Sequence, residues 1–133
     1  MHEVIVKKHL LASHGLKNYL GGDESPHDHH WIIEARFHAE ALDNSGCAID
    51  FRDIDRAFQE ILSPFQGKTL NDLEPFKTVS PSAENLARHI YEQFATLIKD
   101  KKARLVSITA WEDEEHGATY YSTTEALRTQ RNA

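Results

Sequence analysis

The 133-residue sequence contains a single cysteine, Cys47. One thiol cannot form an internal disulfide, and it cannot supply a zinc site built from several cysteines. Any bound metal would therefore rest on histidine and carboxylate side chains. A chain without disulfides also fits a reducing compartment, so we expect the protein in the cytoplasm.

Long apolar runs and basic clusters are also missing. No stretch approaches the roughly twenty apolar residues that cross a bilayer, and the N-terminus lacks the charged start and apolar stretch of a signal peptide. We therefore expect neither membrane insertion nor export. The formal net charge is -6, without a basic run. This balance argues against nucleic-acid binding, although it is compatible with a local basic pocket for an anionic ligand.

The length and composition are those of one compact domain. With 40% hydrophobic residues, the chain can bury a core of its own. We expect a single domain over residues 1–127, followed by a polar C-terminal tail over residues 128–133.

Histidines are concentrated in the stretch GGDESPHDHHW, residues 21–31. In an extended segment His27 and His29 project to the same side, because successive side chains alternate. A catalytic zinc typically uses three protein ligands and keeps a fourth position open, so the pair needs one partner. His14 is the best candidate, although spacing alone does not choose between it and His9, His30 or His38. The alternative is a polar loop with exposed histidines.

Apolar periodicity predicts an α+β fold. Alternation predicts strands at residues 4–12, 31–40, 105–111 and 119–124, with Cys47 packing in a further short strand at 47–51. Apolar residues at helical spacing predict one helix from the Asp50 cap to Pro64 and another from Ser82 to Ile98. Turns are expected at residues 43–46, 100–102 and 114–117, and long connections at 15–26 and 66–79. Two hairpins with helices between them favour a four-stranded antiparallel sheet with two helices packed on one face.

Six segments, in order, resemble the 6-pyruvoyltetrahydropterin synthase and 6-carboxytetrahydropterin synthase family across nearly the whole chain. The first two, ASHGL and PHDHHW, resemble the family's Ala-Ala-His-Arg-Leu and Leu-His-Gly-His-Asn-Tyr segments. The others are AIDFRDI, TLND, SPSAENLARHIYEQF and the strand end Trp111-Glu112.

The resemblance implies a tunnelling fold, in which trimers pair into hexamers with active sites at subunit interfaces. It places the Zn²⁺ ligands on His14, His27 and His29. It places on Glu112 the carboxylate that anchors the pterin ring, since such a group accepts two parallel N–H hydrogen bonds. It also places Ser82 near the pterin. An equal alternative is that Ser82 only caps the start of a helix. The zinc would polarise the hydroxyls of the pterin side chain.

The chain departs from the family at the expected base. Asp23 stands where the family has a cysteine, and Gln66-Gly67-Lys68 replaces its Asp-His pair. Glu24, three residues before His27, matches a branch of the family that carries a glutamate there. A glutamate can act as the base if burial raises its pKa, and His116 or His30 could carry protons. The alternative is a solvated loop acid.

Three functions follow from these residues. The first is a zinc-dependent pterin lyase acting on dihydroneopterin or its triphosphate. The second is a pterin- or purine-binding protein that retains zinc and the ring anchor without turnover. The third, a structural zinc domain, is disfavoured by an open three-histidine site. The sequence leaves open a queuosine, folate or biopterin-like pathway. Basic residues available for a triphosphate are Lys7, Lys8, Lys17, Arg36 and Lys68.

Overall fold

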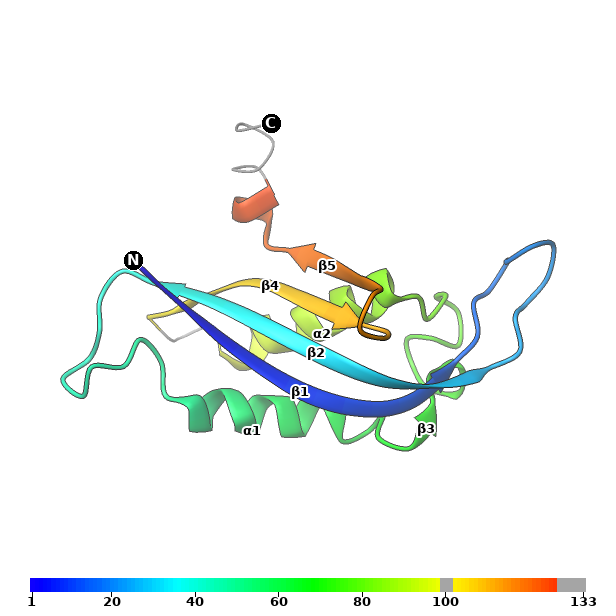
Figure 1. Cartoon of the computed structure of the whole chain (residues 1–133), viewed down its shortest axis with the longest axis horizontal. Coiled ribbons are helices and arrows are strands. Elements are labelled where there is room, and N and C mark those ends of the chain that lie inside the picture. The colour runs from blue at the N-terminus through cyan, green and yellow to red at the C-terminus, as the bar shows by residue number, and fades with distance from the viewer. Residues whose placement is uncertain (99–101, 127–133) are drawn as a thin grey trace.

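A computed structural model describes residues 1–98 and 102–126 and shows a mixed α+β fold (Figure 1). The elements are β1 (His2–His14), β2 (His27–Ala39), α1 (Phe51–Leu62), β3 (Lys68–Thr69), the short 3-10 helix η1 (Leu70–Asp72), α2 (Ala83–Leu97), β4 (Arg104–Trp111) and β5 (Gly117–Tyr121). The predicted C-terminal tail, and most of the predicted turn at 100–102, lie outside the described residues.

The strands form one sheet in the order β3-β1-β2-β4-β5. β1 and β2 pair antiparallel along their whole length, from His2 opposite Ala39 to His14 opposite His27. β4 and β5 continue the sheet antiparallel, whereas β3 pairs parallel with β1. The sheet thus has one strand more than the four expected. β3 has only two residues, too few for any alternation to show in the sequence.

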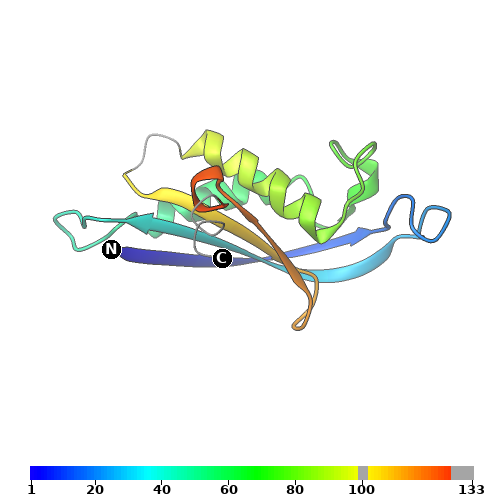
Figure 2. The same ribbon diagram turned by 90° about the horizontal axis from the view of Figure 1, so that it is seen from above.

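Both long helices lie on the same side of the sheet (Figure 2). Their apolar faces cover every second residue of β2, where Trp31, Ile33, Ala35 and Phe37 have no exposed surface. At the centre the rings of Phe37 and Phe94 pack edge to face, 5.9 Å apart. The predicted antiparallel sheet with helices on one face is confirmed, and its core forms from the alternation read in the sequence. No described helix has the length and apolar character needed to span a bilayer.

The predicted short strand at residues 47–51 is wrong. The carboxylate of Asp43 accepts the backbone N–H groups of Ser45 and Cys47 at 2.8 and 2.9 Å, and Asp50 caps α1 through the N–H of Arg52 at 2.9 Å. The turn and the helix cap thus occupy backbone N–H groups that would have to pair with another strand if this segment were a strand. Cys47 is consequently exposed rather than packed.

Other strands also have different bounds from those expected, and β1 spans His2–His14 instead of residues 4–12. β2 begins at His27, four residues before the predicted start. β5 ends at Tyr121, and residues 123–126 form one helical turn instead of continuing the strand. That turn begins where the hydroxyl of Ser122 accepts the N–H of Glu125 at 3.1 Å.

The face of the sheet opposite the helices carries charged side chains, with Ile5 and Leu11 exposed among them. At its centre Glu34 is only 5% exposed, accepts a hydrogen bond from Arg36 Nε at 2.7 Å and lies 3.7 Å from Lys7 Nζ. Arg36 also donates to Glu3 at 3.0 Å. The charges on this face are therefore largely committed to one another.

Candidate metal centre

Three imidazoles meet at the end of the long strand pair. His14 is paired directly opposite His27, and His29 lies opposite Ala12. Alternation places all three side chains on the helix-covered face, in line with Trp31. Their ring centroids are 4.5 to 5.0 Å apart. The expectation that His27 and His29 project together, with His14 beside them, agrees with this arrangement.

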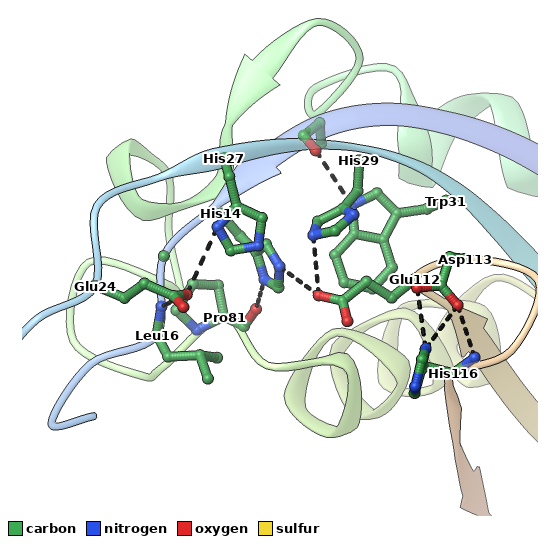
Figure 3. A network of polar contacts seen from close by, with 12 residues as sticks. His14, Leu16, Glu24, His27, His29, Trp31, Pro81, Glu112, Asp113 and His116 are labelled. Atoms are coloured by element: carbon green, nitrogen blue, oxygen red, sulfur yellow. Dashed lines mark hydrogen bonds and ion pairs between the residues drawn. The ribbon is translucent and has the colours of Figure 1, made fainter. Parts of the chain in front are cut away.

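Glu112 joins the three histidines from the end of β4 (Figure 3). It directly follows Trp111, which β4 pairs with Ile32 of β2. Its Oε1 atom lies 2.7 Å from His14 Nε2 and 3.1 Å from His29 Nε2. One donor atom from each of the four residues lies within 4.8 Å of all the others. Three imidazoles and a carboxylate form a donor set that zinc accepts.

The proton arrangement of the cluster fits a bound cation. His14 is buried, and its Nδ1 donates to the carbonyl oxygen of Pro81 at 2.6 Å. A neutral His14 then turns a lone pair, not a proton, toward the Glu112 carboxylate. The contact requires a further proton, on His14 or on Glu112, or a cation bound by both groups. A carbonyl that fixes the tautomer in this way is usual behind metal-binding histidines.

His29 supports the same interpretation. Its buried Nε2 has no partner in hydrogen-bonding geometry within the described chain, although Glu112 Oε1 is near. Burial lowers the pKa of His29, and the negative charge of Glu112 opposes this shift. The neutral imidazole, the form that binds metal, is therefore favoured at this position.

Glu24 lies beside the cluster in the loop between β1 and β2. Its Oε1 is 3.7 Å from His27 Nδ1 and accepts the backbone N–H of Leu16 at 3.1 Å. The side chain is half-buried, at 29% exposed. The neighbouring Asp23 instead accepts the N–H of Asn18 at 3.1 Å. Glu24 is thus the acid of this loop that contacts a candidate ligand.

The loop is fixed by Asn71, to which the sequence assigned no role. Its side-chain amide accepts from Gly15 N at 2.9 Å and donates to Gly15 O at 2.8 Å. A Cβ atom on Gly15 would overlap the backbone oxygen of Glu24. The sequence did show Asn71 within the motif TLND. The motif alone does not reveal that the Asn71 amide forms hydrogen bonds with Gly15, the residue after His14.

The other candidate residues have structural contacts. The hydroxyl of Ser82 caps α2 by accepting Asn85 N–H at 3.1 Å, so its helix-start role is seen, and pterin binding stays a prediction. His116 contacts Asp113 at 2.8 Å in an exposed loop. His30 contacts His9 at 2.9 Å on the opposite face of the sheet.

The glutamine in place of the family's Asp-His pair also has a structural role. The side-chain amide of Gln66 accepts from Leu11 N at 3.0 Å and donates to His9 O at 2.9 Å. It satisfies backbone groups of β1 beyond the two-residue strand β3.

A comparison of the sequence with models of protein families finds one family. The sequence model described as 6-pyruvoyl tetrahydropterin synthase matches residues 3–123. No curated protein matches the chain.

Solved structures share the fold at low sequence identity. The 6-pyruvoyl tetrahydropterin synthase of Caenorhabditis elegans superposes with a TM-score of 0.78 at 19% identity, covering 92% of this chain and 98% of that one. The enzyme of Plasmodium falciparum gives 0.74 at 15% identity, covering 91% and 97%. A Plasmodium vivax variant, in which a catalytic glutamate is replaced by cysteine, gives 0.74 at 16%, covering 91% and 97%.

Proposed function

Because this chain belongs to the 6-pyruvoyl tetrahydropterin synthase family, we propose that it is a zinc-dependent pterin lyase acting on the side chain of dihydroneopterin or its triphosphate. The observation that carries the proposal is the convergence of His14, His27, His29 and Glu112 on one point, with Glu24 beside them. Assembly into trimers or hexamers is part of the same proposal.

The three histidines would hold the metal. His14 is oriented for this by Pro81, and His27 and His29 share a strand face. When bound, zinc supplies Lewis-acid polarisation of the hydroxyls on the pterin side chain. An imidazole site also accepts other divalent ions, so zinc is the proposal and its identity is a matter for metal analysis.

Glu112 would bind the pterin ring. Its carboxylate can accept two parallel N–H groups of the amino-pyrimidinone, which fixes the ring plane. It lines a cavity of about 690 Å³ together with His29 and Trp111, a volume suited to a small heterocyclic ligand. If Glu112 turns to the ring, the metal keeps the open position that a catalytic site needs.

Glu24 would act as the general base. A base must reach the proton it removes, directly or through one water. Glu24 lies against the outer nitrogen of His27, on the rim of the cluster. A glutamate is also described as a catalytic residue in the Plasmodium vivax relative, which supports this assignment without fixing the residue here.

The test is turnover of the zinc-loaded protein with dihydroneopterin and its triphosphate, with products separated by chromatography. We expect Glu24→Ala to lose at least about 100-fold in kcat, the usual contribution of a general base, while retaining its zinc. Asp23→Ala is the matched control, because it removes an adjacent acid that only ties the loop. An equal loss in both variants would assign the effect to the loop.

A second candidate is a pterin-binding protein without turnover. Gln66 and Asp23, at the positions of the family's relay and cysteine, are both engaged with backbone amides. Binding of pterin by the zinc-loaded protein, with no product from either pterin, would favour this function.

A further inference from the structure

Residues 80 and 81, just before α2, contact both the metal centre and the loop beside it. Pro81 is buried, and its carbonyl oxygen accepts the Nδ1–H of His14 at 2.6 Å (Figure 3). The hydroxyl of Ser80 accepts the backbone N–H of Lys17 at 3.0 Å, in the loop that carries Glu24. These two neighbouring residues therefore bear on the orientation of a candidate ligand and on the path of that loop.

Asn85, in the first turn of α2, holds the two residues from the other side. Its side-chain amide donates from Nδ2 to the carbonyl oxygen of Ser80 at 2.9 Å. The peptide between Ser80 and Pro81 has no N–H group, because its nitrogen belongs to the proline ring. The carbonyl is therefore the only hydrogen-bonding group of this peptide, and Asn85 is bonded to it.

The geometry of proline passes this constraint on to the carbonyl that His14 contacts. The peptide unit is planar, and the ring of Pro81 fixes its φ torsion. Only the ψ torsion of Pro81 then remains to direct its carbonyl, and the next residue is Ser82, whose hydroxyl caps the helix. The Pro81 carbonyl thus lies between a peptide held by Asn85 and the cap of α2.

A fixed carbonyl matters because it decides which nitrogen of His14 is free to bind a metal. The bond to Pro81 places the proton on Nδ1 and leaves a lone pair on Nε2, the nitrogen that lies 2.7 Å from Glu112. His14 is only 2% exposed, so water has little access to replace the carbonyl. A shift of Pro81 by about 1 Å would take the bond outside hydrogen-bonding range and free the ring to turn.

Helix formation alone does not account for asparagine at position 85. Ser82 is the N-cap, and its hydroxyl accepts the backbone N–H of Asn85 at 3.1 Å, a bond that any residue other than proline could make. Glutamate or glutamine is usual three residues after such a cap, and asparagine is a weaker helix former. What the asparagine side chain adds is its bond to Ser80.

We propose that Asn85 is a positioning residue of the metal centre. It holds the Ser80–Pro81 peptide, and Pro81 in turn holds the His14 ring in the orientation that binds the ion. Each of these contacts is made within a single chain. The inference rests on the proposed function, since it concerns how the same metal centre is assembled.

The first experiment compares zinc affinities by competition with a chelator. Asn85→Ala removes the donor, and Asn85→Asp removes it while placing a favourable acid in the first turn of the helix. We expect both variants to weaken zinc binding at least about tenfold, the usual order for a residue behind a metal ligand. The charge of the aspartate would by itself attract a cation, so weaker binding in that variant cannot come from charge.

Asp50→Ala is the matched control. It also removes a side-chain hydrogen bond at the start of a helix, the one that Asp50 accepts from Arg52 N–H at 2.9 Å in α1. We expect this variant to keep the zinc affinity of the unaltered chain. An equal loss of affinity in Asp50→Ala would assign the effect to helix stability and overturn the inference.

The imidazole proton of His14 gives a second readout, which general stability does not change. In the zinc-loaded protein we expect the Nδ1–H of His14 to give a sharp downfield NMR signal, because its bond to Pro81 protects it from exchange with water. Asn85→Ala and Asn85→Asp should move this signal upfield and broaden it, whereas Asp50→Ala should leave it in place. A signal that is unchanged in both variants of Asn85 would overturn the inference.

Failure of the proposed function gives a different result. If the unaltered chain binds zinc but converts neither dihydroneopterin nor its triphosphate, the lyase is refuted, and weaker zinc binding in Asn85→Asp still supports the inference. If the unaltered chain turns over a pterin and both variants of Asn85 keep its zinc affinity, the proposed function stands and the inference is overturned.

Discussion

Gly15 joins the candidate ligand His14 to the loop that carries Glu24. It follows β1 directly, and its N–H and carbonyl are both bonded to the side chain of Asn71. The loop lies so close that Gly15 has no room for a Cβ atom beside Glu24. The position of Glu24, the proposed base, is thus coupled to that of the candidate metal ligand His14 through the backbone of Gly15.

Replacing Asn71 tests this coupling. We expect Asn71→Ala to lower the free energy of unfolding by about 1–3 kcal/mol, because two backbone groups lose their partner. It should also weaken zinc binding, since Gly15 is adjacent to His14. Denaturant unfolding and zinc titration measure the two effects. Asn44→Ala, an exposed amide in the turn before α1, is the control. Unchanged zinc affinity in Asn71→Ala would show that His14 is held without the clamp.

A single substitution tests whether Glu112 binds the pterin ring or the metal. We expect Glu112→Gln to lose pterin affinity by about 10-fold to 100-fold, because the amide replaces an acceptor by a donor where two ring N–H groups need acceptors. Zinc content, measured by atomic absorption, should stay near that of the unaltered chain. Loss of zinc with pterin affinity retained would make Glu112 a metal ligand instead.

At the scale of elements, α2 carries a half-buried histidine, His89, beside its apolar side. His89 packs against the rings of Phe65 and Phe76, each 5.7 Å away. Burial lowers the pKa of His89. As pH falls through about 6.5, the unfolded chain therefore takes up a proton before the folded chain does. The free energy of unfolding should decline over that range.

His89→Phe should flatten this pH dependence. We expect the decline in unfolding free energy between pH 7.5 and 5.5 to be smaller in the variant, measured by urea denaturation with EDTA present so that bound metal does not contribute. His2→Phe, at the exposed start of β1, is the control. An unchanged decline in His89→Phe would show that other groups cause it.

Sequence periodicity predicted the elements whose pattern repeats over several residues. The alternation from Trp31 to Ala39 and the caps at Asp50 and Ser82 are all seen in the structure. Periodicity could not predict β3, which exists through pairing with β1, a contact between distant segments. Nor could it show that β2 begins at His27, because the polar residues before Trp31 resemble a loop and their extension depends on β1.

For the site, the sequence supplied residue types and the structure supplied the contacts between them. The family resemblance named His14, His27, His29 and Glu112, and the structure brings these four side chains together, while their roles stay predictions. The contact of His14 with the Pro81 carbonyl, the bonds of Asn71 to Gly15 and the pairing of Arg36 with Glu3 join residues that are far apart in the sequence. Such contacts leave no local pattern.

At the scale of the whole molecule, metal binding should stabilise the chain. The cluster joins β1, β2 and the end of β4, so it exists only in the folded state. We expect zinc at about 100 times its dissociation constant to raise the free energy of unfolding by about 2.7 kcal/mol. Thermal unfolding with zinc or EDTA measures this. His14→Ala should abolish the difference, whereas an equal zinc effect in that variant would place the binding elsewhere.

The pair of His14 and His27 is the last in the pairing of β1 with β2, the longest in the sheet. Its position has a consequence for how the chain folds. Sliding β2 by one residue along β1 would send His27 and His29 to the opposite face, away from His14. An ion that needs all three imidazoles would bind only chains whose strands had met in the native alignment. The metal would thereby stabilise only the native register of β1 and β2. Chains with a shifted register would gain no such stabilisation and would unfold more readily.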